Sequence, residues 1–169
     1  MNCPSCGAPM RPDGDGLRCD YCHTVAFPEK DDSGVRVLGE APGYVCPVCD
    51  SPLMQATLAG VRLCYCTRCR GMSIPMPAFE DLIAQLRAAP VAATASAKAG
   101  SSSDLDRRIK CPHCRRGMTA DWYAGPGHVV IDSCETCLLN WLDHGELMRI
   151  AQGADSFEPI EVEGAVFGR

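Results

Sequence analysis

Cysteine is the residue type in this sequence with the clearest chemistry. Twelve of the 13 cysteines in 169 residues fall into six pairs of the form C-x-x-C. Two thiolates separated by two residues can bind one metal ion, and two such pairs complete a tetrahedral four-cysteine zinc site. Taking the pairs in order along the chain predicts three sites with one Zn²⁺ in each: Cys3, Cys6, Cys19 and Cys22; Cys46, Cys49, Cys66 and Cys69; Cys111, Cys114, Cys134 and Cys137.

This sequential pairing is favoured by the spacing of the pairs and by an internal repeat. The intervals between successive pairs are 12, 23, 16, 41 and 19 residues, so short and long intervals alternate. A proline follows the first cysteine of each predicted unit, and a methionine comes soon after the first pair. Repetition of this kind indicates copies of one module. A cross-braced arrangement of the first two units is the alternative pairing.

Other chemistry of the thiols is less favoured. Iron in a tetrathiolate site is an alternative, because the ligand type alone does not separate it from zinc. A dithiol redox motif needs a C-x-x-C at the start of a helix in a βαβ unit, and no such pattern is present. The thirteenth cysteine, Cys64, lies two residues before Cys66 and on the same face of a strand. We favour a small buried residue there over an alternate ligand or a reactive thiol.

We predict that the protein is not an enzyme and has no catalytic residues. A catalytic zinc keeps an open coordination position, whereas four sulfurs are available here for each ion. The four histidines form no HxxH or HxxxH pair: His23, His113, His128 and His144. His23 directly follows Cys22, and we expect it to be an exposed neighbour of the first site rather than a ligand.

The rest of the composition explains why metal would be needed. Only 10 residues are aromatic and 29 are glycine or proline, so a single hydrophobic core would be too small to offset the chain entropy. Structural zinc contributes folding energy directly. The sequence has no run of 18 apolar residues that would predict a membrane span, and it shows no secretory signal. We therefore expect a cytoplasmic protein, in which disulfides are rare.

The elements that would position the cysteines are short hairpins. We predict small metal-dominated β-hairpin modules, three tandem four-cysteine zinc ribbons, with a short helix after the second and after the third. In the second ribbon, 52–58 and 61–65 are predicted strands, and an i, i+3, i+4, i+7 apolar pattern predicts a helix over 77–88. The predicted organisation is ribbon one at 1–27, a linker at 28–43, ribbon two with its helix at 44–88, a flexible linker at 89–108, ribbon three with its helix at 109–152 and an acidic tail at 153–169.

The third module resembles a known family. From Cys134 to Leu147 it reads C-E-T-C-L-L-N-W-L-D-H-G-E-L. This stretch is similar to the bacterial transcription-factor-B-type zinc ribbon, the zf-TFIIB domain, which typically reads C-P-x-C, a hairpin, and then C-x-x-C-x-G-x-W-L-D-x-G-E-L. Leu139 stands where that family usually has glycine. The second module keeps this glycine at Gly71, but has Ser73 and Pro75 at the Trp and Asp positions.

The resemblance implies zinc binding and a structural role for its motif. Trp141 is expected to lie against the ribbon, and Asp143 with Glu146 forms a capping-box pattern for the following helix. A family named by analogy with a transcription-factor ribbon supports a role in transcription only weakly.

Charge bears on the kind of partner. The formal net charge is −5, and binding three Zn²⁺ through twelve thiolates would bring it to −11. Nucleic-acid binding usually requires a basic patch, so we favour a protein-interaction adaptor whose partner is another protein. Nucleic-acid binding is the alternative, because several basic residues lie near the second and third sites: Arg68, Arg70, Arg107, Arg108, Lys110, Arg115 and Arg116. A thiol or zinc redox sensor that uses Cys64 is a minor alternative.

Overall fold

The structure of the chain, a computed structural model, is mostly β and describes residues 1–88, 100–125 and 127–153. No helix in these ranges is long and apolar enough to cross a membrane. The elements are β1 (Met10–Asp13), β2 (Gly16–Cys19), β3 (Val25–Ala26), β4 (Arg36–Val45), β5 (Pro52–Leu58), β6 (Val61–Tyr65), β7 (Met72–Pro75), α1 (Met76–Ala88), the 3₁₀ helix η1 (Ser102–Asp106), β8 (Thr119–Trp122), β9 (Val130–Cys134), β10 (Leu139–Leu142) and α2 (Glu146–Gln152).

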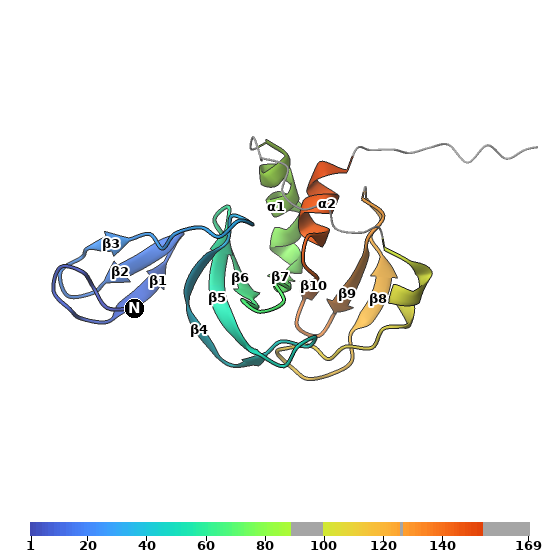
Figure 1. The fold of residues 1–169 in the computed structure, drawn as a ribbon, viewed down its shortest axis with the longest axis horizontal. Coiled ribbons are helices and arrows are strands. Elements are labelled where there is room, and N and C mark those ends of the chain that lie inside the picture. Colours follow the sequence, from blue (N-terminus) through green and yellow to red (C-terminus); the bar gives the residue numbers. More distant parts are fainter. Residues whose placement is uncertain (89–99, 126, 154–169) are drawn as a thin grey trace, which may run out of the picture.

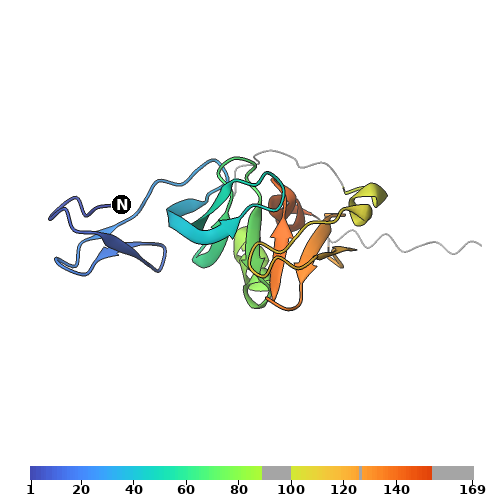
Figure 2. The same cartoon turned by 90° about the horizontal axis from the view of Figure 1, so that it is seen from below.

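The first unit, residues 1–27, forms a separate small sheet. Its three strands are antiparallel in the order β1-β2-β3, and Leu17 of β2 is fully buried. Figures 1 and 2 show this sheet at one end of the molecule, next to β4 and β5. A carboxylate oxygen of Asp15 accepts hydrogen bonds from the Thr57 hydroxyl at 2.5 Å and from the Gly60 backbone amide at 3.1 Å. The hairpin turn of the first unit is therefore attached to the β5–β6 hairpin.

The second and third units are joined in one seven-stranded sheet with the order β4-β5-β6-β7-β10-β9-β8. This differs from the prediction of separate modules on tethers. The joining strands are β7 and β10, each of which follows the second C-x-x-C pair of its unit, and they pair antiparallel. Ser73 pairs directly with Trp141, and each lies four residues after the last cysteine of its unit. Equivalent positions thus face each other, which gives the two units an approximate local two-fold relation.

The stretch predicted as a linker, 28–43, holds much of strand β4, and the structure corrects this assignment. Val35, Leu38 and Ala41 are almost fully buried, and β4 pairs with β5 along most of its length. The register shifts between Val37 and Gly39 and again between Glu40 and Val45. These irregularities interrupt the alternation of apolar and polar residues, which hides the strand from a pattern-based reading.

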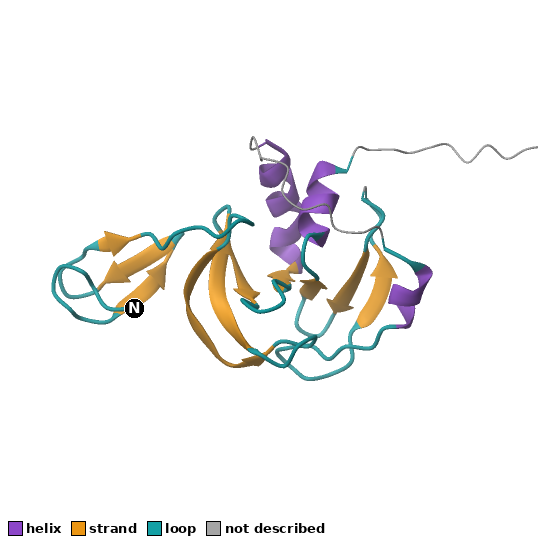
Figure 3. Ribbon diagram, viewed as in Figure 1, coloured by secondary structure: helices purple, strands orange, loops and turns teal. Residues whose placement is uncertain are grey.

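The main apolar core lies between the two α-helices and one face of this sheet. Figure 3 shows both helices on the same side of the strands. The predicted helical face is confirmed, because the side chains of Phe79, Leu82, Ile83 and Leu86 are all buried. They pack with α2 residues such as Ile150 and with strand residues from both units. The core is therefore shared between the second and the third unit.

Part of the predicted flexible linker, 89–108, is folded. Residues 89–99 lie outside the described residues, as does nearly all of the predicted acidic tail, 154–169. Gly100 donates a backbone hydrogen bond to the carbonyl of His128 at 2.9 Å, and η1 follows directly. Arg107 then forms an ion pair with Asp132 at 2.9 Å. The chain from Gly100 onward thus belongs to the third unit.

Candidate metal centres

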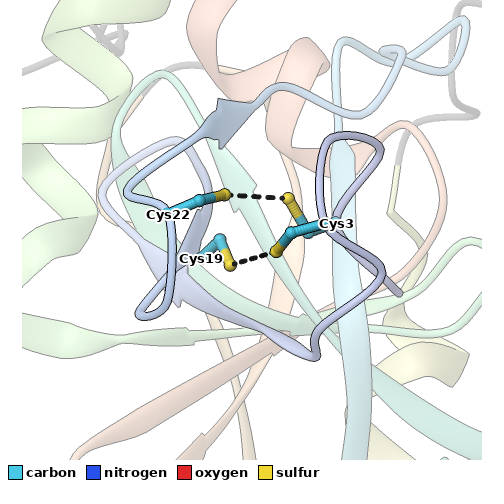
Figure 4. A group of neighbouring side chains, drawn as sticks. Cys3, Cys19 and Cys22 are labelled. Atoms are coloured by element: carbon cyan, nitrogen blue, oxygen red, sulfur yellow. Dashed lines mark hydrogen bonds between the residues drawn. The ribbon is translucent and has the colours of Figure 1, made fainter.

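The structure brings the twelve paired cysteines together in three groups of four, each made of two successive C-x-x-C pairs. Within each group all four sulfur atoms lie within 4.8 Å of one another. Figure 4 shows the first group, in which the sulfurs of Cys3 and Cys22 lie 3.5 Å apart. The sulfurs of Cys6 and Cys19 are also 3.5 Å apart, and the corresponding distances in the other groups are 3.4 Å for Cys49–Cys66 and 3.7 Å for Cys114–Cys134. The groups follow the sequential pairing and not a cross-braced one.

These distances fit a tetrahedral metal ion. Zn–S bonds of about 2.3 Å place the sulfurs of a regular tetrahedron about 3.8 Å apart. A disulfide would instead require about 2.05 Å between sulfurs. Four thiolates at this separation suit Zn²⁺, so the chain carries three four-cysteine metal sites of the size that zinc requires.

The backbone holds each C-x-x-C pair in the same tight turn. The residue after each second cysteine has a positive φ, and the six residues are Gly7 (φ 75), His23 (φ 59), Asp50 (φ 57), Arg70 (φ 60), Arg115 (φ 63) and Leu138 (φ 52). In the first five of these residues, the backbone amide donates a hydrogen bond to the carbonyl of the first cysteine of the pair. The amide of Gly7, for example, donates to the carbonyl of Cys3 at 2.9 Å. Only Gly7 is a glycine, so composition alone does not indicate the repeated turn. Each turn points two sulfurs toward one ion.

Hydrogen bonds to sulfur favour the thiolate form in which cysteine binds metal. The Thr24 side chain lies 3.2 Å from the Cys22 sulfur and lowers the pKa of that thiol to about 6. The Ser51 side chain lowers the pKa of Cys49 to about 6, and a backbone amide at Arg116 lowers the pKa of Cys114 to about 7. One thiol in each group is thus favoured as the thiolate, whereas burial raises the pKa of others, to about 11 at Cys69 and about 12 at Cys137.

The three sites differ in how well they are protected from solvent. In every pair the first cysteine is buried, but in the first site Cys6 and Cys22 are exposed. The second and third sites lie together in a second apolar cluster on the face of the sheet opposite α1 and α2. We call this face, which carries Cys64, Ser73, Leu139 and Trp141, the metal face. Metal in the first site would therefore be the most accessible of the three.

Trp141 is a fully buried member of the apolar cluster on the metal face. Its side chain packs with cysteines from both the second and the third site. A Cβ atom added at Gly71 would lie only 2.5 Å from Trp141 Cζ2, so this position must be glycine. Ser73, the strand partner of Trp141, is likewise small. The tryptophan thus contacts both units and not only its own ribbon.

A partly buried network of charges holds Trp141 in place. Its indole Nε1 donates to Asp143 Oδ1 at 3.1 Å, and Asp143 also pairs with Arg107. The expected capping box is therefore only half formed. Glu146 Oε2 accepts the Asp143 backbone amide at 2.7 Å, but the Asp143 side chain binds Arg107 and Trp141 instead of the helix. Burial raises the pKa of Glu146 to about 7 and the pKa of Asp132 to about 6.

The structure places the histidines and Cys64 outside the three groups. His23 is exposed, as expected. His113 stacks on Tyr44 with ring centroids 4.0 Å apart, and His128 stacks on Trp122 at 4.3 Å. Cys64 lies partly buried beside its strand partner Ser73, and burial raises the pKa of its thiol. The nearby Ser73 hydroxyl lowers the pKa of this thiol, although the two groups do not form a hydrogen bond of standard geometry.

Comparisons of the chain with protein-family models, with curated proteins and with solved structures found no match.

Proposed function

We propose that this protein is a non-enzymatic zinc-ribbon adaptor that binds three structural Zn²⁺ ions and docks onto another protein. Each group of four cysteines supplies all the ligands of a tetrahedral ion, which supports a structural role and leaves no position for substrate. The zf-TFIIB resemblance of the third unit is part of this proposal. Its Trp141 and Glu146 serve packing and helix geometry, which supports a folding role for that motif.

The observation that carries the adaptor function is the exposed apolar surface of the first unit. Among the described residues, seven large apolar side chains are exposed, and four of them belong to residues 1–27: Met1, Tyr21, Val25 and Phe27. Tyr21 is 87% exposed, and Val25 lies on the edge strand β3. Apolar groups concentrated on so small a unit are typical of an interaction surface.

The test is affinity capture from the native host with the zinc-loaded protein and two variants. Tyr21→Ser/Val25→Ser changes the exposed surface of the first unit. Val48→Ser is the matched control, because Val48 is 46% exposed and holds the same position in its C-x-x-C turn as Tyr21. We expect a partner that the double variant loses and the control retains, and that binds again when purified. Loss of the partner from both variants, or no partner with the wild type, would contradict the proposal.

Nucleic-acid binding is the second candidate, and unpaired basic side chains support it. Seven exposed cations form no ion pair with any residue in the described ranges: Lys30, Arg62, Arg68, Arg108, Lys110, Arg115 and Arg116. A mobility shift with random DNA or RNA that weakens steeply with salt would favour this candidate. Absence of a shift at low salt would leave the adaptor function.

A further inference from the structure

A pocket on the metal face lies where the second and third units meet. Its volume is about 270 Å³, and its floor is formed by Cys64, Ser73, Pro75 and Leu139. Ser73 and Pro75 belong to β7 and Leu139 to β10, so the pocket spans the strand pair that joins the two units. None of the twelve clustered cysteines lines it, so the pocket is distinct from the metal sites.

Two stacked rings form one wall of this pocket, and each comes from a different unit. Tyr44 extends from β4, and His113 lies between Cys111 and Cys114 in the third metal site. Their planes differ by only 11°. His113 lies in the C-x-x-C turn of the third metal site, and Tyr44 belongs to the second unit. The wall is therefore complete only when the two units are joined.

The polar groups at the pocket favour an anionic ligand that also accepts or donates a hydrogen bond. Ser73 is only 1% exposed, and its hydroxyl, which lies near the Cys64 thiol, makes no hydrogen bond of standard geometry with a described residue although Ser73 lines the pocket. A buried hydroxyl without a partner is costly, so a ligand that reaches it would be stabilised. At the rim, the guanidinium of Arg62 is exposed and forms no ion pair with a described residue.

The size of the pocket favours one inserted side chain over a complete small molecule. Pockets for small molecules usually have volumes of about 300–1,000 Å³ and enclose most of the ligand. This one is smaller, and most of its floor is apolar. We propose that it binds an acidic peptide segment of a partner protein, with one apolar side chain against Pro75 and Leu139, a backbone group of the peptide on the Ser73 hydroxyl and a neighbouring carboxylate on Arg62. The proposal deepens the adaptor function and rests on it.

The probe is the peptide acetyl-Asp-Glu-Leu-Glu-Asp-amide, titrated into the ¹⁵N-labelled, zinc-loaded full chain and followed by NMR. We expect the largest amide shifts at Cys64, Ser73 and Leu139. Replacing the leucine of the peptide by alanine should weaken binding, because the apolar contact is lost. Arg62→Ala should weaken binding about tenfold, as expected when a charge-assisted contact is removed.

Arg68→Ala is the matched control, because Arg68 is also exposed and unpaired in the described structure but does not line the pocket. It should change the affinity less than about twofold, since it touches neither the floor nor the rim. Equal losses from the two arginine variants, or no shifts at millimolar peptide, would overturn the proposal. Shifts at the pocket with an oligonucleotide but not with the peptide would also overturn it. If the wild type captures a partner through the first unit but does not bind the peptide, only the pocket assignment fails and the adaptor function stands.

Discussion

Adding one methyl group at Gly71 tests how the second and third units are joined. The new Cβ would lie 2.5 Å from Trp141 Cζ2 and 3.2 Å from Cε2, whereas carbon atoms pack at about 3.5–4.0 Å. The indole ring cannot move away easily, because it is fully buried and its Nε1 is hydrogen-bonded to Asp143. The backbone of Gly71 is not in the left-handed region, so alanine introduces only this overlap.

We expect Gly71→Ala to destabilise the joined units by about 3 kcal/mol, at the upper end for overpacking in a rigid core. The assay is urea unfolding of the zinc-loaded protein, followed by tryptophan fluorescence. The chain has two tryptophans, and a Trp122→Phe background leaves Trp141 as the single reporter. Zinc content, measured in parallel, separates a packing defect from loss of metal at the neighbouring Cys69.

Two comparisons make this prediction specific. Gly39→Ala is the matched control, because Gly39 also lies in a strand but has open space around its Cβ position. It should change stability by less than about 1 kcal/mol. In a Trp141→Leu background, followed by circular dichroism, Gly71→Ala should cost less than about 0.5 kcal/mol because the clash is gone. An equal loss with and without Trp141 would refute the reasoning, as would wild-type stability in the single variant.

Three further predictions concern the zinc ions, Cys64 and Glu146. Metal analysis should give three zinc ions per chain, and one or two zinc ions in the fresh protein would contradict the three sites. A chelator should remove the zinc ion of the first site before the other two, because Cys6 and Cys22 are exposed. Cys64→Ser should keep three zinc ions, and a lower content would show that Cys64 is a ligand. Glu146 is stabilising in its neutral form, because its pKa is raised from 4.5 to about 7; this contribution is complete below pH 4.5 and is lost as the pH rises through 7. Glu146→Gln should therefore be more stable than the wild type above pH 7, by at most about 3 kcal/mol. In urea titrations this difference in stability should disappear toward pH 5. A difference that does not change with pH would contradict the prediction.

Local patterns predicted the parts of the fold that depend on neighbouring residues. The C-x-x-C spacing predicted which cysteines come together, and the strands Pro52–Leu58 and Val61–Tyr65 are those observed. The apolar spacing that begins at Phe79 predicted the helix to within one residue at its start. In each case the signal lies within about ten to twenty residues of sequence, where turn chemistry and periodicity act.

The pairing of the second and third units could not be predicted in this way. Ser73 and Trp141 are 68 positions apart in sequence, and no periodic pattern links them. The available signal was the size of the residues at two positions of the second unit. This unit keeps glycine at Gly71 and has the small Ser73 at the position where the third unit has Trp141. The structural role of Arg107, which the sequence showed only as one of several basic residues, was missed for a similar reason. The residue lies in a stretch rich in small residues and becomes recognisable only when its partner Asp132 is found buried.

The β7–β10 pair has a consequence for how the molecule assembles. Each of these strands would, in a single unit alone, be an open sheet edge able to associate with a second chain. Here both edges belong to one polypeptide, so their association is intramolecular and proceeds at a millimolar-range effective concentration when the linker permits it. The association therefore does not depend on how much protein the cell makes. Because the chain contains both strands of this pairing, dilution cannot separate them.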